Sequence, residues 1–202
     1  IDTLKAFTRV TISGHIEDNN GQLINDFSGI LYPSVYDKSK TVTTLANDSY
    51  TVPMQFSTRE DILYKGKVSV ANGRFRFEFI VPKDITYSYG NGRISYFSNN
   101  NLIDANGHFS SFIIGGTNYI SEQDNNGPDI SLWLNDEYFN NQGITNSSPV
   151  IFARINDESG INTVGNGIGH DITGVIDGDV ANPVIMNEFF TADLNNASAG
   201  EL

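Results

Sequence analysis

The chain has 202 residues, of which 39% are hydrophobic and 11% aromatic, so it holds enough apolar side chains for one large domain or two of about 100 residues each. Its formal net charge of −12 at pH 7 repels phosphate backbones and anionic lipid head groups, so we expect no nucleic-acid partner. No apolar stretch approaches the roughly 20 residues of a membrane-spanning helix, and we expect no membrane insertion by this segment.

The absence of cysteine excludes disulfide bonds, thiolate metal sites and a cysteine nucleophile within these residues. Charged residues make up only 18%, below the roughly 25% typical of soluble domains, and asparagine and glycine fill the gap. Both residue types favour tight turns, because they adopt positive φ angles more readily than other residues. The sequence starts at Ile1 with neither an initiator methionine nor a signal peptide, so we expect a processed or excised piece of a longer protein.

Alternation of apolar and polar residues predicts β-strands from the start of the chain. Val10, Ile12 and Ile16 face one way in this pattern, and polar residues lie between them. An Asp-Asn-Asn-Gly turn at 18–21 follows, and further strands are predicted at 27–36 and 49–57.

The clearest strand signal surrounds the dipeptide Asn72-Gly73. Asn-Gly between two alternating runs predicts a type I′ hairpin turn, because that turn needs positive φ at both central residues. We therefore predict a hairpin over 65–81. The alternation after the turn predicts that Phe75, Phe77 and Phe79 face a core.

The rest of the chain continues in short strands separated by turn clusters. Strands are predicted at 93–98, 109–115, 130–135, 150–156 and 171–177, with a weaker one near 184–187. Gly, Asn and Asp clusters at 90–92, 98–101, 104–107 and 124–128 predict turns. Only 183–194 has partly helical spacing, and we expect no helix longer than about three turns.

These elements predict an all-β fold of two consecutive, immunoglobulin-like β-sandwich modules. We place the first module at 1–121, a polar linker containing Gly and Pro at 122–128, and the second module at 129–202. The second module has too few strands to close a sandwich of about seven. We expect the first module, a neighbouring chain or native sequence after Leu202 to complete it, and the last is the favoured source.

The sequence predicts no catalytic residue. His15, His108 and His170 are scattered, and no serine lies in a Gly-x-Ser-x-Gly motif. Asp171 follows His170 directly, but neighbours along a strand point to opposite faces. The glycine-rich run 165–171 has no lysine or arginine near it, so we interpret it as a tight connection and not as a phosphate loop.

Calcium is the one cofactor for which the sequence offers ligands. Asp124, Asn126 and Asp129 lie together at the predicted junction and carry the oxygen ligands that hard cations prefer. Asp104 and Asn106 form a second, smaller cluster. Neither cluster matches an EF-hand loop, and the competing interpretation is that these residues only form turns.

Four aromatic residues have two interpretations each. Trp133 lies between two leucines, so it either fills a core or covers the contact between the modules. Tyr87, Tyr89 and Tyr96 either line a glycan-binding face or pack across strands, as aromatic residues of β-proteins usually do.

Several motifs together resemble one protein family. They are Val-Ser-Val-Ala-Asn-Gly-Arg-Phe at 68–75 with its continuation to residue 85, Asp-Ala-Asn-Gly at 104–107, Ile-Gly-Gly at 114–116, Asp-Glu-Ser-Gly-Ile-Asn at 157–162, and Gly-Ile-Gly-His-Asp-Ile at 167–172. In this order they resemble the region that follows the peptidase domain in PorU-type proteins. Those proteins are gingipain-like cysteine peptidases that act as sortases of the type IX secretion system in Bacteroidetes. The resemblance covers about 8–192.

The resemblance implies a non-catalytic accessory segment, because the family's catalytic cysteine and histidine lie in the upstream domain. It implies as partners that peptidase domain in the same chain and other components of the secretion system. It also implies export to the outer-membrane exterior of a Gram-negative bacterium. The alternative is a surface adhesin-like or glycan-binding β-sandwich protein without a peptidase, since one fold serves many functions.

Overall fold

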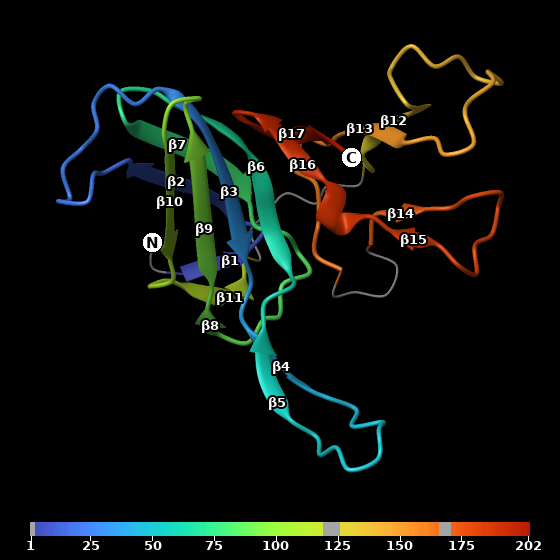
Figure 1. The fold of residues 1–202 in the computed structure, drawn as a ribbon, viewed down its shortest axis with the longest axis horizontal. Coiled ribbons are helices and arrows are strands. Elements are labelled where there is room, and N and C mark those ends of the chain that lie inside the picture. Colours follow the sequence, from blue (N-terminus) through green and yellow to red (C-terminus); the bar gives the residue numbers. More distant parts are fainter. Residues whose placement is uncertain (1–2, 119–125, 166–170) are drawn as a thin grey trace.

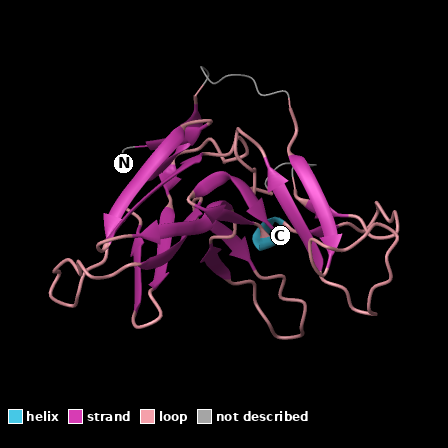
Figure 2. Ribbon diagram, turned by 90° about the horizontal axis from the view of Figure 1, so that it is seen from above, coloured by secondary structure: helices cyan, strands magenta, loops and turns pink. Residues whose placement is uncertain are grey.

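The structure, a computed structural model, describes residues 3–118, 126–165 and 171–202. These residues form strands β1 to β17 and a single 3-10 helix, η1 (Asn187–Phe189) (Figures 1 and 2). The all-β fold predicted from the sequence is confirmed. The segment 183–194, whose spacing was partly helical, forms β15 (Val184–Ile185), η1 and β16 (Thr191–Leu194).

An eight-stranded sheet runs through the whole molecule. Its order is β10 (Asp104–Phe109), β9 (Arg93–Asn99), β3 (Gly29–Tyr36), β6 (Ile62–Val70), β16 (Thr191–Leu194), β17 (Asn196–Glu201), β13 (Ile151–Asn156) and β12 (Asp129–Leu134). All neighbours in this sheet are antiparallel except β6 and β16, which are parallel. The sheet therefore contains strands from both predicted modules.

Smaller sheets complete the fold. The strands β2 (Arg9–His15) and β7 (Arg74–Ile80) form one pair, and β1 (Thr3–Ala6), β11 (Ile113–Thr117) and β8 (Gly90–Asn91) form a three-stranded sheet. Two hairpins extend from the body: β4 (Lys40–Thr43) with β5 (Gln55–Thr58), and β14 (Thr173–Gly174) with β15 (Val184–Ile185) (Figure 1).

The predicted turn at Asn72-Gly73 is present, but the strands beside it do not pair with each other. Both residues have positive φ, 51° and 69°, and Ala71 and Arg74 exchange both backbone hydrogen bonds. Beyond this bridge the strands separate: β6 pairs with β3 and β16, whereas β7 pairs with β2. The prediction of a paired hairpin over 65–81 was therefore wrong in its pairing, because the turn connects two layers of the fold.

The separation of β6 and β7 builds the core. Phe75, Phe77 and Phe79 on β7 are 9%, 5% and 2% exposed, so their predicted orientation is confirmed. Tyr64 on β6 stacks on Phe77 and Phe79, with ring centroids 5.3 Å and 5.0 Å apart. Burial raises the pKa of Tyr64 to about 12. Aromatic side chains from two layers thus interlock across the sandwich.

The C-terminal part joins the first part through the open edge of β6. Ala192 of β16 is fully buried and lies opposite Gly66 of β6. Asn195 extends the contact: its side-chain oxygen accepts a bond from the backbone N–H of Ser69 at 2.8 Å, and its amide nitrogen donates to the Ser69 hydroxyl. The sheet of residues 129–202 is thus continued by a strand of the first part, one of the three sources expected for its missing strands.

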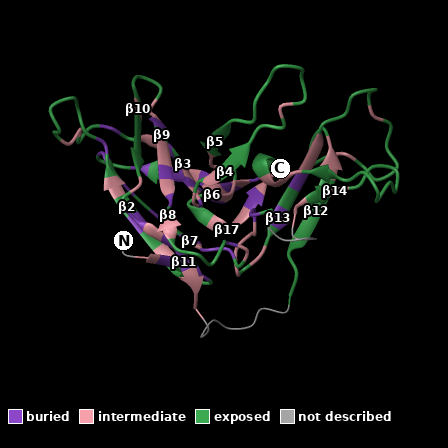
Figure 3. Cartoon of the chain, turned by 90° about the horizontal axis from the view of Figure 1, so that it is seen from below, coloured by how far each residue is buried: buried purple, intermediate pink, exposed green. Residues whose placement is uncertain are grey.

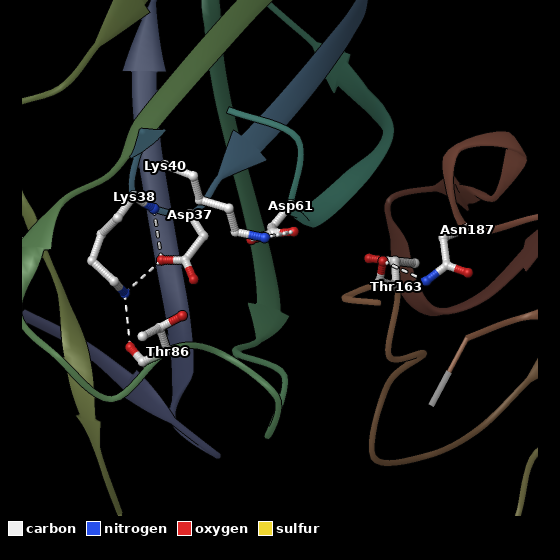
Figure 4. Close-up of polar contacts among 7 residues, drawn as sticks. All are labelled: Asp37, Lys38, Lys40, Asp61, Thr86, Thr163 and Asn187. Atoms are coloured by element: carbon white, nitrogen blue, oxygen red, sulfur yellow. Dashed lines mark hydrogen bonds and ion pairs between the residues drawn. The ribbon is translucent and has the colours of Figure 1, made fainter. Parts of the chain in front are cut away.

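A second contact between the two parts is polar and buried. The Thr163 hydroxyl donates to the carbonyl of Ile62 at 2.7 Å, and the Asn187 amide donates to the carbonyl of Thr163 at 3.0 Å (Figure 4). Thr163 is only 6% exposed, so its hydrogen bonds are sheltered from water. This contact fixes η1 against the start of β6.

Several elements differ from the predicted ranges. The predicted strand 109–115 is interrupted, since β10 ends at Phe109 and β11 begins at Ile113. The predicted strand 49–57 is reduced to β5, and that at 171–177 to β14. The run 104–107, predicted as a turn, lies in β10, whose outer edge has no strand partner among the described residues. Small polar residues are tolerated on such an edge strand, because most of its side chains face water.

Candidate functional site: a charged cavity beside the β4–β5 hairpin

A cavity of about 520 Å³ lies where the β4–β5 hairpin meets the body of the molecule. Three segments line it. The first is residues 37–40, which lead from β3 into β4, and the second is Arg59 and Asp61 between β5 and β6. The third comprises Thr86 and residues 88–91, which lead into and include β8. Its size falls in the usual range for small-ligand sites, about 300–1,000 Å³. The lining is almost entirely polar or charged.

A buried ion pair forms one wall of the cavity. The Asp37 side chain is 2% exposed and accepts hydrogen bonds from the backbone N–H and the Nζ of Lys38, both at 2.7 Å. Lys38 Nζ also donates to the carbonyl of Thr86 at 2.8 Å (Figure 4). Because both charges have partners, this pair fixes the loop positions around the cavity, and breaking it would leave a buried charge uncompensated.

A second ion pair lines the cavity beside the first. Lys40 Nζ lies 2.9 Å and 2.7 Å from the two carboxylate oxygens of Asp61 (Figure 4). The Asp61 side chain is 11% exposed, whereas that of Lys40 is 40% exposed. The backbone N–H of Asp37 donates to the carbonyl of Asp61 at 2.9 Å, so the two pairs share one framework.

Arg59 differs from the two lysines because it has no ion-pair partner among the described residues. Its Nε is buried and lacks a hydrogen-bond partner, the one such side-chain atom found in the part of the chain that the structure describes. Buried polar atoms are nearly always hydrogen-bonded, so an exception needs an explanation. Arg59 supplies an unused cationic group at the cavity wall.

Tyr89 supplies the one aromatic ring of the cavity. It is 68% exposed. Two glycines make room for it, since a Cβ at Gly116 would lie 2.7 Å from the Tyr89 hydroxyl and one at Gly115 would lie 2.9 Å from its Cα. Both glycines have positive φ, 151° and 73°. The ring is therefore held at the cavity by a backbone conformation that side chains rarely adopt.

This arrangement suits binding better than proton transfer or nucleophilic attack. Both carboxylates of the lining are engaged by lysines, and a general base needs a free carboxylate within reach of its substrate. Cations, hydroxyls, amides and one aromatic face are the groups that orient a polar ligand.

The residues predicted as calcium ligands do not form a described site. Asp124 lies outside the described residues, and Asn126 and Asp129 are exposed around the start of β12. In residues 3–118, 126–165 and 171–202, no group of three or more His, Asp or Glu side chains could hold a metal ion. A calcium site at this junction stays a prediction.

The two described histidines, His15 and His108, lie on strands of different sheets. His15 is exposed and bonds to Glu17, and His108 lies exposed on β10. His170 and residues 166–169 of the glycine-rich run lie outside the described residues.

The aromatic residues named from the sequence differ in their surroundings. Tyr96 packs against Phe75, with ring centroids 5.6 Å apart, and burial raises its pKa to about 12. Tyr87 is 54% exposed, next in sequence to the cavity residues Thr86 and Ser88. Trp133 is half-buried and packs on Phe152 of β13.

Among the exposed apolar side chains outside the cavity, two groups form surfaces that bear on function. The first, the hairpin surface, is formed by the side chains Leu45, Tyr50, Val52, Met54 and Phe56, which are at least half exposed in and around the β4–β5 loop (Figures 1 and 3). The second, the edge surface, is formed by Ile130 and Leu132 of β12, which are 63% and 65% exposed. Exposed apolar groups of this kind are typical of interaction surfaces.

The cavity was missed in the sequence, although a signal for it exists. Asp37-Lys38-Ser39-Lys40 and Arg59-Glu60-Asp61 concentrate charge in two short runs of a chain that has only 18% charged residues. The first run leads into β4 and the second follows β5, so both lie at the open end of the β4–β5 hairpin. A prediction of that hairpin would have placed the two runs side by side.

Comparison with known proteins finds similarity among solved structures. No protein-family model matches the sequence, and no curated protein matches it. Among solved structures, the chain is similar to dimeric latent PorU from Porphyromonas gingivalis, with 31% sequence identity and a TM-score of 0.58. The match covers 100% of this chain but only 19% of PorU. In the described part of the chain, no helix has the length and apolar character to cross a membrane. The fold of this chain is thus related to that of a part of PorU.

Proposed function

We propose that this chain is a non-catalytic accessory segment of a type IX secretion sortase, which positions a gingipain-like peptidase domain of the same protein. The observation that carries the proposal is the similarity to PorU along all 202 residues at 31% identity. The sequence motifs that resemble the region after the peptidase domain point the same way. The chain itself contains no cysteine, so the nucleophile of such an enzyme would lie elsewhere.

The two apolar surfaces support a positioning role. The hairpin surface extends from the body, and the edge surface lies on the last strand of the eight-stranded sheet (Figure 1). Apolar side chains in these places suit docking onto other domains of the same protein or onto other components of the secretion system. By the same resemblance, the protein acts outside the outer membrane of a Gram-negative bacterium.

The test uses the complete gene in its bacterial host. The double substitution Leu45→Asp and Tyr50→Asp alters the hairpin surface without touching the core, since both residues are at least 82% exposed. We expect exported proteins to accumulate with their C-terminal sorting signals uncleaved, while the variant protein is made in normal amounts. Leu102→Asp, at an 88% exposed site outside this surface, is the matched control.

Two results would count against the proposal. The first is normal processing after the whole segment is deleted, which would mean that the peptidase does not need it. The second is a gene that encodes no gingipain-like domain with cysteine and histidine upstream of this segment. The second result would favour a surface adhesin-like or glycan-binding protein.

A further inference from the structure

The geometry points to the charged cavity as a binding site for a sugar acid, with Arg59 holding the carboxylate and Tyr89 stacking on the sugar ring. The sugar acid is either a free uronate or the terminal uronate of a glycan. This inference concerns the cavity alone, and it holds whether or not a peptidase domain is attached to the chain.

The charge of the cavity selects an anion. Lys38, Lys40 and Arg59 face Asp37 and Asp61, so the lining carries one more positive than negative charge. The whole chain, by contrast, has a net charge of −12. The two lysines are already neutralised by the two aspartates, which leaves the Arg59 guanidinium to provide the excess charge.

The unused arginine selects a carboxylate. A guanidinium presents its N–H donors in a planar fork that matches the two oxygens of a carboxylate. The buried Nε of Arg59 has no hydrogen-bond partner in the described part of the protein. The protein itself covers the Nε, so a carboxylate would bind across the two terminal nitrogens of the guanidinium and would neutralise the charge there.

The remaining lining selects a polyhydroxylated ligand over a peptide. Peptide-binding grooves offer apolar pockets for side chains, and no aliphatic side chain lines this cavity. Ser39, Ser88 and Asn91 offer hydroxyl and amide groups that donate and accept hydrogen bonds, as sugar hydroxyls require. Tyr89 adds an exposed aromatic face for the apolar C–H face of a sugar ring.

The site is held in place before a ligand arrives. The Asp37–Lys38 pair is buried, and the side chain of Lys38 fits against Gly90, where a Cβ would lie 2.7 Å from Lys38 Cδ. Gly115 and Gly116 make the corresponding room for Tyr89. A rigid lining lowers the entropic cost of binding, so a small ligand is captured without rearrangement of the loops.

The experiment is saturation-transfer NMR with titration on the complete protein, using glucuronate, galacturonate and glucose as probes. We expect saturable binding of at least one uronate in the millimolar range, weakened by added salt, and no binding of glucose at the same concentrations. The ring protons of the bound sugar should receive the strongest transfer, because they would lie against Tyr89. An oligosaccharide that ends in the same uronate distinguishes a glycan from the free sugar by binding more tightly.

Arg59→Gln should weaken uronate binding at least about tenfold, since it removes the charge and the guanidinium fork but keeps a polar side chain. Arg76→Gln, at a 67% exposed site on β7, is the matched control and should bind as the parent does. Tyr89→Ala should weaken binding and abolish the strong ring-proton transfer, whereas Tyr89→Phe should keep both. Tyr138→Ala, at an 89% exposed site on the loop after β12, serves as the control for loss of a tyrosine.

Three results would overturn the inference. One is the absence of saturable uronate binding by a correctly folded protein. Another is equal affinity of the parent and the Arg59→Gln variant for a uronate, or equal affinity of the parent for glucuronate and glucose. Either result would mean that the site does not recognise the carboxylate. The third is stronger binding of a short glutamate-containing peptide than of either uronate, which would assign the cavity to acidic peptides.

Discussion

Truncating Phe77 to alanine tests the burial of this side chain between β7 and β6. The side chain is 5% exposed, and its ring stacks on Tyr64 of the opposite layer. In a hairpin whose strands paired side by side, the two rings would lie in one sheet, and this contact across the sandwich would not exist. The stability lost on truncation therefore reports on how fully Phe77 is buried, and so on the register of β7.

The expected loss follows from the buried area. An aromatic side chain buries roughly 150–250 Å², which at about 25 cal/mol per Å² corresponds to about 4–6 kcal/mol. This value is an upper estimate, because the unfolded chain already shields part of the ring and alanine keeps its Cβ. We expect Phe77→Ala to lower the free energy of unfolding by about 3–5 kcal/mol, the range measured for buried phenylalanine.

Guanidinium denaturation followed by far-UV circular dichroism measures this loss. Glu78→Ala is the matched control, because Glu78 is next along β7 but points outward, where it bonds to Thr11 and Arg76. It should cost less than about 1 kcal/mol, as exposed pairs usually do. If Phe75→Ala, Phe77→Ala and Phe79→Ala each cost less than about 1 kcal/mol, the register of β7 is off by one residue and the reasoning fails.

Three further outcomes are expected from the same structure. Gly73→Ala should lower the free energy of unfolding by about 2 kcal/mol or more, because φ is +69° and the new Cβ would lie 2.3 Å from a backbone oxygen. Gly107→Ala is the control, since a Cβ there would have nothing within 4 Å, and it should change the free energy of unfolding by no more than about 0.5 kcal/mol. Chemical denaturation of both variants measures these changes. Asn195→Ala should lower the midpoint of thermal unfolding and cost about 1–2 kcal/mol, because it removes two hydrogen bonds to β6 at a residue with φ of +57°. Absorbance titration at alkaline pH should show two late tyrosines, Tyr64 and Tyr96, whose pKa burial raises to about 12. Since these pKa values are raised from 10 by folding, the stabilisation they give is fully present below pH 10 and is lost as the pH rises from 10 to 12, and Tyr64→Phe should reduce that loss.

Local signals carried the correct part of the sequence-based prediction. The Asn72-Gly73 turn depends on the φ preferences of two adjacent residues, and the orientation of Phe75, Phe77 and Phe79 depends on the two-residue period of a strand. Neither requires knowledge of a distant segment. Both are present in the structure.

The charged cavity could not be assembled from local signals in the same way. Its lining comes from residues 37–40, Arg59 and Asp61, and a loop near residue 90. The first two segments meet because β4 pairs with β5, a hairpin with an eleven-residue loop at 44–54 and no tight-turn signature. The third segment reaches the site through β8, which is only two residues long. Such pairings depend on contacts between residues that are far apart in the sequence, and composition and periodicity carry no information on those contacts.

The pairing of β6 shows why the predicted hairpin failed beyond its turn. A strand of nine residues with buried side chains at Leu63, Tyr64, Val68 and Val70 needs a partner on each edge and an apolar layer against its inner face. If β7 paired beside β6, its phenylalanines would share that face and would need another layer to cover them. With β7 in the opposite layer, Phe77 and Phe79 supply the cover for Tyr64, and one edge of β6 is left for another strand. The strand β16 fills that edge in parallel orientation, which a tight turn could not have provided. The residues after the predicted linker are therefore part of the first sandwich's sheet. Without β16, one edge of β6 would have no strand paired with it.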